Sequence, residues 1–233
     1  MQANDRTIAI LEEAARLLYR EWFVNLRFPG WHQARRQNNL PVGWCKAPVS
    51  ALVETNPKVV FDRHRSCPFV PMQSLSETSM VIYGVEERII QGGAKFENFD
   101  TLLARITPCL ENGKTGFVQF LTDDAPVASG STEFIVLRSK LVSPYWVYCI
   151  ARDDAFRKHV IASMAGSDGR QRVNTKCFDS YFALQPPQEI LDAFDEIVRP
   201  MFAQINNLAK MNQRLKACRD ALLPKLMSGE FSI

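Results

Sequence analysis

The C-terminal part of the chain has the most regular pattern of hydrophobic and polar positions. From Ile190 onward, apolar residues recur at alternating steps of four and three, and only Gln204 among the ten positions is polar. The ten positions are Ile190, Phe194, Ile197, Met201, Gln204, Leu208, Met211, Leu215, Cys218 and Leu222. This spacing predicts the seam of a coiled coil on one helix of about 40 residues, or roughly 60 Å. The helix is expected to follow Pro187, to bend or loosen at Pro200, and to end at Gly229.

The N-terminal residues repeat this spacing over a shorter length. Ile8, Leu11, Ala15, Leu18 and Trp22 predict a helix from about residue 5 to residue 24. A helix of about 20 residues covers only about half of the long one. The uncovered half has two interpretations, packing on the chain's own core or pairing with a second subunit, and we favour the second.

The segment between the two helices has short β-type runs separated by turn residues. Strands are predicted at 69–75, 100–107, 114–122, 131–139 and 182–185, with a hairpin turn at Asn112-Gly113. Two helices interrupt them, one capped by Ser143 and running through Arg152, and one over 153–164. The sequence therefore predicts the α+β class. One globular, mixed-strand domain (29–186) is flanked by a short N-terminal helix (1–28) and a long C-terminal coiled-coil helix (187–233).

Composition narrows the class of protein. The chain has 233 residues, of which 46% are hydrophobic and 23% charged, as in folded globular proteins. The longest apolar run, 145–151, is too short to cross a membrane, and the N-terminus does not resemble a signal peptide. The six cysteines form no CxxC pair, which argues against a metal site and fits a reducing compartment. A cytoplasmic protein without a membrane partner is expected.

One loop is the best candidate for binding. Residues 165–173 contain two glycines, and Arg170 and Arg172 flank Gln171. Residues 157–176 contain five basic residues and one acidic residue, a patch suited to DNA phosphates and base edges. The predicted DNA-binding residues are Arg170, Gln171, Arg172 and Lys176, with Arg105 and Lys114 as weaker candidates. The alternative is an ordinary loop after a helix, with solvated arginines.

Catalytic motifs are absent from the sequence. Asp100, Glu111 and Lys114 could suggest a nuclease site, but Glu and Lys stand three apart across a glycine turn and would not share one strand face. The chain has no P-loop, no GxSxG, no HExxH, and no glycine-rich loop with Asn-Pro-Pro-aromatic for methyl transfer. No catalytic residue, metal or cofactor is therefore expected.

Several stretches together resemble a known family. They are LLYREWFVNLRFP (17–29), KFENFDTLLARITPCLENGKTGFVQFL (95–121), GSTEFIVLR (130–138), SMAGSDGRQRV (163–173) and LKACRDALLPKLMSGE (215–230). They are similar to the C-terminal half of the specificity subunit of type I restriction-modification systems. Residues 55–94 match poorly.

The resemblance implies a particular arrangement of domains and partner subunits. A full specificity subunit has two target recognition domains, each reading half of a split DNA sequence, separated by two paired helices, whereas this chain has one domain. Either two copies assemble as a homodimer, or the chain is a shortened subunit that lacks its other half. Modification (methyltransferase) and restriction subunits are the implied partners. The helix-pairing residues would be Ile197, Met201, Leu208, Leu215, Leu222, Leu18 and Trp22.

Two other functions stay open at this point. One is a nuclease or methyltransferase that acts alone, against which the missing motifs speak. The other is a remnant that binds partner subunits but no DNA.

Overall fold

The computed structural model describes residues 1–62, 64–89, 92–166 and 169–228. Gly229, where the long helix was predicted to end, and positions 167 and 168 of the candidate loop lie outside these ranges. The α+β class predicted from the sequence is confirmed, with a helix at each end and mixed strands between them.

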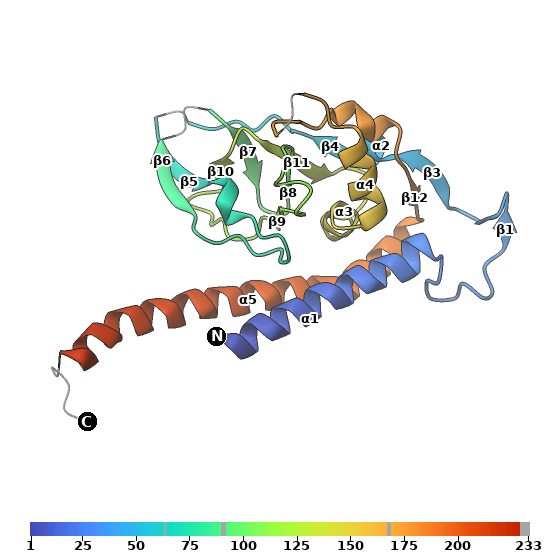
Figure 1. Cartoon of the computed structure of the whole chain (residues 1–233). Helices are drawn as coiled ribbons and strands as arrows, with labels where there is room; N and C mark the ends of the chain where they lie inside the picture. The colour runs from blue at the N-terminus through green and yellow to red at the C-terminus, as the bar shows by residue number, and fades with distance from the viewer. Residues whose placement is uncertain (63, 90–91, 167–168, 229–233) are drawn as a thin grey trace.

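Two helices from opposite ends of the sequence lie side by side and antiparallel (Figure 1). They are α1 (Gln2–Tyr19), which continues into a π-helical turn, η1 (Arg20–Val24), and α5 (Gln188–Met227). At one end of the pair, Asn4 Nδ2 donates to Asn212 Oδ1 over 2.9 Å. At the other end, the ring centroids of Trp22 and Phe194 are 6.0 Å apart. The predicted pairing of the N-terminal helix with the long helix is therefore confirmed.

The helix α5 continues through Pro200, so the loose turn predicted there is wrong. Proline removes the hydrogen bond to the carbonyl four residues earlier, at Glu196. Both residues are exposed, so water can solvate that carbonyl group.

The buried seam of α5 lies about one position away from the predicted one. Only Phe194 and Leu208 of the predicted seam are among its buried residues, which are Leu191, Phe194, Val198, Phe202, Ile205, Leu208, Ala209 and Asn212. Predicted seam residues such as Ile197 (40% exposed) and Leu215 (44%) face solvent. The reason is that α5 packs on the globular part as well as on α1. Phe202 lies with its ring centroid 4.9 Å from that of Phe117, a strand residue.

The end of α5 is exposed throughout the residues that the structure describes. Every residue of 213–227 is exposed, and Figure 1 shows this segment projecting past the N-terminus of α1. We call residues 213–224 the free arm. Of the two interpretations of the uncovered half, packing on the chain's own core is therefore wrong for this segment.

Two four-stranded sheets form the globular part. One has the order β4-β11-β8-β9, built from Val53–Thr55, Phe134–Ser139, Thr101–Ala104 and Thr115–Phe117. The other has the order β6-β5-β10-β7, built from Glu86–Ile89, Ser66–Val70, Val127–Gly130 and Ala94–Glu97. The predicted hairpin is confirmed, since β8 and β9 pair antiparallel.

Two small sheets lie beside them. In one, β1 (Arg36–Gln37) pairs with β2 (Leu40–Pro41). In the other, β3 (Cys45–Pro48) pairs with β12 (Phe182–Gln185), the strand predicted at 182–185. This last pair brings the start and the end of the globular part together.

Short helices pack beside the sheets. The predicted cap of the first inner helix is present, since Ser143 caps α3 (Pro144–Ala151). The second, α4 (Asp154–Ala162), begins one residue later than predicted, because Asp153 is its cap. The remaining helical segments are α2 (Val49–Leu52) and two 3-10 turns, η2 (Met72–Ser74) and η3 (Thr175–Asp179).

One hydrophobic core joins the helix pair to the globular part. It contains residues of α1, α3, α5 and the sheet of β8, and includes Trp22, Trp44 and Trp146. A smaller core fills the space between the two four-stranded sheets around Phe96 and Leu102. Among the described helices, none combines the length and the apolar character that a membrane span requires.

Candidate nucleic-acid interface

The candidate loop is held against the end of strand β8. Arg172 forms antiparallel bridges with Ile106 and with Ala165, on both sides of it. The amide of Thr107 donates to the Gln171 carbonyl over 3.1 Å, and the amide of Gln171 donates to Thr107 Oγ1 over 3.1 Å. The described residues of the loop therefore have a backbone fixed by the sheet.

A glycine makes this loop geometry accessible. Gly166 has a φ of +133°, and a β-carbon there would lie 3.2 Å from the Arg170 carbonyl oxygen. Any other residue would strain the backbone at this position. This glycine is thus needed for the fold of the loop itself.

The strand register places an acid beside two arginines. Strand β11 pairs Phe134 with Ala104, so the next pair beyond the strands is Glu133 with Arg105, and the Arg105 amide donates to the Glu133 carbonyl over 3.0 Å. The Glu133 carboxylate accepts from Arg172 at distances of 2.8 and 3.0 Å. Arg105 Nε lies 3.6 Å from the same carboxylate. Hydrogen bonds from Arg172 hold the pKa of Glu133 below its usual value, so it is ionised at neutral pH.

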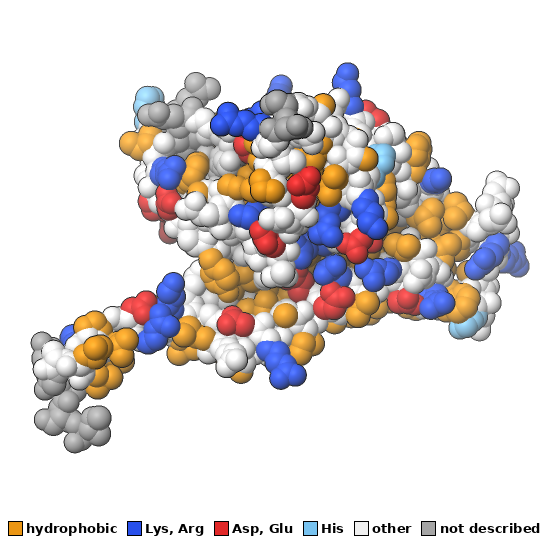
Figure 2. Space-filling model, in the orientation of Figure 1, with side chains coloured by type: hydrophobic (Ala, Val, Ile, Leu, Met, Phe, Trp, Pro, Cys, Tyr) orange, Lys and Arg blue, Asp and Glu red, His pale blue; other side chains and the backbone are white. Residues whose placement is uncertain are grey.

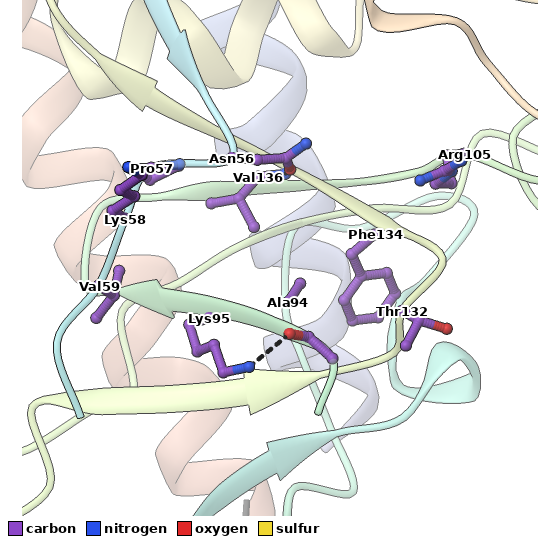
Figure 3. Close-up of a pocket in the computed structure, with 11 residues that line it drawn as sticks. Asn56, Pro57, Lys58, Val59, Ala94, Lys95, Arg105, Thr132, Phe134 and Val136 are labelled. Atoms are coloured by element: carbon purple, nitrogen blue, oxygen red, sulfur yellow. Dashed lines mark hydrogen bonds between the residues drawn. The ribbon is translucent and has the colours of Figure 1, made fainter. Parts of the chain in front are cut away.

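A groove of about 600 Å³ begins at Arg105 (Figure 3). Its walls come from the segment after β4, from the start of β7 and from the start of β11. Its lining residues are Asn56, Pro57, Lys58, Val59, Gly93, Ala94, Lys95, Arg105, Thr132, Phe134 and Val136. Three of these are basic and none is acidic, so the groove is suited to an anionic ligand.

Lys95 in the groove and Arg88 in an adjacent hollow each lie over an aromatic ring. Lys95 Nζ donates to the Gly93 carbonyl over 2.9 Å, the dashed line in Figure 3. The same atom lies 4.8 Å from the centre of the Phe61 ring. A second hollow shares Gly93 and Thr132 with the groove and contains Arg88, whose guanidinium lies 4.1 Å above the Phe69 ring. The two hollows adjoin at these shared residues, and together we call them the basic face.

The structure brings only some of the predicted DNA-binding residues together. Arg105, Gln171 and Arg172 are joined by the backbone and ion-pair contacts above, and Arg170 is exposed beside them. Lys176 lines another hollow together with Lys140. Lys114 is half-buried, with Nζ 3.5 Å from the Met72 carbonyl oxygen.

Sequence reasoning missed Lys58, Lys95, Arg88 and Glu133. Lys58 and Arg88 lie in the stretch 55–94, which matched the family poorly, and Lys95 is the first residue of the matching stretch 95–121. Glu133 lies opposite Arg105 only because the predicted strands 100–107 and 131–139 pair with each other, and that pairing was not predicted.

The side chains weighed as catalytic are engaged in structural contacts. Asp100 is buried, and both of its oxygens accept from Arg138 at 2.7 Å, so it is not free to bind a metal. His159, a half-buried side chain that could otherwise act as a base, has its Nε2 atom 2.9 Å from the Cys177 carbonyl oxygen. Within the described ranges, no three His, Cys, Asp or Glu side chains are grouped to hold a metal ion.

Comparison with known proteins identifies the relatives of the chain. It is 24% identical over 96% of its length to the MjaIX specificity subunit, a type I restriction enzyme subunit of Methanocaldococcus jannaschii. It is 28% and 30% identical to the EcoAI and EcoEI specificity subunits of Escherichia coli, over 68% and 64% of its length. The chain resembles part of a type I restriction enzyme specificity subunit. The resemblance inferred from the sequence is thereby confirmed.

The chain is shorter than these type I specificity subunits. The matched region spans 54% of the MjaIX subunit, 28% of the EcoAI subunit and 26% of the EcoEI subunit. No protein-family model matches the chain. In structure it is similar to a type I restriction-modification S subunit from M. genitalium, with a TM-score of 0.56 and 13% identity over 97% of this chain and 58% of that one. This likeness shows a shared fold.

Proposed function

We propose that the chain is a DNA-recognition subunit of a type I restriction-modification complex and reads one half of a bipartite sequence. The observation that carries this proposal is the similarity to type I specificity subunits along nearly the whole chain. In this reading the chain is cytoplasmic and non-catalytic, and modification and restriction subunits perform the chemistry.

The basic face supports the DNA part of the proposal. Lys58, Lys95, Arg105 and Arg88 line it, and Arg170 and Arg172 lie at its edge beyond Arg105. Basic side chains around a concave surface attract the phosphates of a duplex, while side chains within it can reach base edges. The loops that build this surface belong to the part of the globular domain away from the helix pair (Figure 1).

The test is binding of the whole chain to duplex DNA over a range of salt concentrations. We expect affinity to fall steeply with salt, by a log-log slope of about −0.9 for each phosphate contacted. Replacing Lys58 and Lys95 by alanine should reduce the affinity and make this slope shallower.

The matched control is Arg27→Ala, which also removes a surface charge. Arg27 follows η1 at the helix pair and pairs with Glu21 over 3.1 Å, away from the basic face. Its replacement should leave DNA affinity unchanged. If the alanine substitutions of Lys58 and Lys95 leave DNA affinity unchanged, the groove is not part of the interface. Cleavage or methylation of DNA by the chain alone would contradict the non-catalytic part of the proposal.

We further propose that two copies pair through their free arms. A single recognition domain defines only one half of a split site, and a two-fold dimer would supply the second. The free arm has apolar side chains near half exposure, namely Leu215, Leu222 and Leu223. Figure 2 shows the hydrophobic side chains gathered at the end of the arm.

Solution mass measured at several concentrations tests this pairing. We expect a dimer that dissociates on dilution, and a monomer for Leu215→Glu combined with Leu222→Glu. The control is Gln213→Glu, because residue 213 lies about 200° around the helix from residue 215. A wild-type chain that stays monomeric at every concentration would refute the homodimer and favour a heteromer with a separate half.

A further inference from the structure

The side chain of Arg172 uses only one edge of its guanidinium within the described structure. Its Nε and Nη2 atoms donate to the Glu133 carboxylate, at 3.0 and 2.8 Å. A guanidinium is planar and has five N–H donors in a fixed fork. The side-on pairing with Glu133 therefore leaves the end-on edge, formed by Nη1 and the second hydrogen of Nη2, available for another acceptor pair.

The backbone beneath Arg172 is locked. Its amide donates to the Ala165 carbonyl over 2.9 Å, and its carbonyl accepts from the Ala165 amide over 3.1 Å. The next amide, of Val173, donates to the Arg105 carbonyl over 2.9 Å. Arg172 is therefore constrained twice. Backbone hydrogen bonds hold its main chain, and Glu133 holds the side-on edge of its guanidinium.

Of the two paired side chains, Arg172 is the more exposed. The Arg172 side chain is 43% exposed, whereas the Glu133 side chain is 23% exposed. The arginine is therefore the more accessible member of the pair to a ligand that approaches from solvent.

An acid in this position disfavours a simple phosphate contact. Glu133 offsets part of the positive charge of Arg172 and Arg105 and repels a phosphate that approaches closely. Arg170 is exposed and forms no ion pair with any described residue, so it is the better phosphate contact of the loop. The pairing with Glu133 therefore fixes the orientation of the Arg172 guanidinium and does not increase its attraction for phosphate.

We propose that Arg172 reads a guanine in the half-site, and that Glu133 is the positioning residue that aims it. Two parallel donors on a rigid edge match the N7 and O6 acceptors that guanine presents in the major groove. Adenine presents a donor in place of O6, so the same edge discriminates against it. This inference rests on the proposed function, because it names the base chemistry that the recognition surface takes.

The experiment is selection of preferred sequences from a pool of randomised duplexes by the whole chain and four variants. Wild type should enrich a motif with at least one invariant G·C pair. Arg172→Ala should lose the preference at one such position while it keeps the rest of the motif. Binding to duplexes that differ only at that pair should change from a preference of roughly 5- to 150-fold to none.

The other three variants distinguish the effect of the orientation of the guanidinium from the effect of its positive charge. Arg172→Lys keeps the charge without the fork, and we expect it to lose the same preference. Glu133→Ala frees the guanidinium, and we expect the preference at that position to weaken while the other positions keep theirs. Arg170→Ala is the matched control, since it removes a neighbouring arginine and should lower affinity for all sequences alike. Thermal melting of each variant verifies that it is folded.

The outcomes distinguish this inference from the proposed function. A wild-type chain that enriches no sequence refutes the recognition function itself. A wild-type motif that Arg172→Ala and Arg172→Lys leave unchanged overturns the role of Arg172. An unchanged preference in folded Glu133→Ala overturns the positioning role.

Discussion

Glu12 is an acidic side chain with only 3% of its surface exposed. Its carboxylate accepts hydrogen bonds from the Tyr148 hydroxyl and from the Met80 amide, and it lies 3.9 Å from Arg152 Nε. Burial is the main cause that raises the pKa of Tyr148, and the charge of Glu12 adds to it, so the tyrosine stays a hydrogen-bond donor. Arg152 Nη1 donates to the carbonyls of Glu77 and Gly113. This buried network fixes α1 to the globular part.

We predict that Glu12→Ala destabilises the chain by roughly 3–5 kcal/mol, because it leaves Arg152 as a buried charge without its partner. Urea unfolding measures the change. Glu13→Ala is the control, because Glu13 is 49% exposed and pairs with Arg16 at the surface, where ion pairs contribute about 0–1 kcal/mol. Equal stability of the two variants would show that the buried pair does not hold α1 in place.

The cysteines should differ in reactivity with a thiol reagent. Cys45 and Cys218 are exposed, whereas Cys149 is buried and burial strongly raises the pKa of its thiol. Since the thiolate is the reactive form, we expect fast labelling at the two exposed sites and labelling of Cys149 only after unfolding. Peptide mass mapping after brief labelling reads this out. Rapid modification of Cys149 in the native chain would contradict its packing beneath α1.

At the scale of elements, the caps decide where the inner helices begin. Asp153 Oδ1 accepts from the amides of Ala155 and Phe156, at 2.9 and 3.3 Å, and Asp153 was included in the helix predicted over 153–164. We predict that Asp153→Ala costs about 0.5–2 kcal/mol of stability. Its neighbour is the control, because Asp154 makes only an exposed contact with Arg157 and should cost less than about 0.5 kcal/mol on replacement. Denaturant unfolding compares the two.

The elements were predicted best where local chemistry determines them. Ser143 before a proline defined α3, and the turn at Asn112-Gly113 defined the β8–β9 hairpin. The face of α5 was misplaced by about one position, because a 3-4 spacing identifies an apolar stripe but does not show that Phe202 packs on the sheet beside it. The strand at 66–70 began earlier than the predicted 69–75 for a similar reason, since its limits follow from pairing with β6 and β10.

The candidate site was less predictable than the fold. Arg105, Arg170 and Arg172 were found because they stand out within short motifs. Glu133 and Lys95 reach the same surface through strand pairing between distant segments, which no local pattern reveals. Arg172 was predicted as a free DNA contact, and its pairing with Glu133 could only be seen once the loop and the strand were placed together.

At the scale of the whole molecule, the helix pair and the globular part share one core, and the free arm lies outside it. We predict that a chain ending at Arg214 keeps the thermal stability of the full chain and loses self-association. The physical reason is that the deletion removes exposed residues and none of the buried seam. Thermal melting followed by circular dichroism measures the stability, and sedimentation measures the self-association. A large drop in melting temperature would show that the arm folds back on the body in solution.

The pairing of α1 with α5 joins residues about two hundred positions apart, such as Asn4 and Asn212. Closing so long a loop carries a large entropic cost unless the intervening chain has already become compact. On a ribosome, α1 emerges long before α5 and can first dock on α3, where Tyr19 contacts Trp146 at a ring-centroid distance of 5.6 Å. We therefore expect α5 to join last, so that the free arm becomes available to a partner only after the recognition surface has been built.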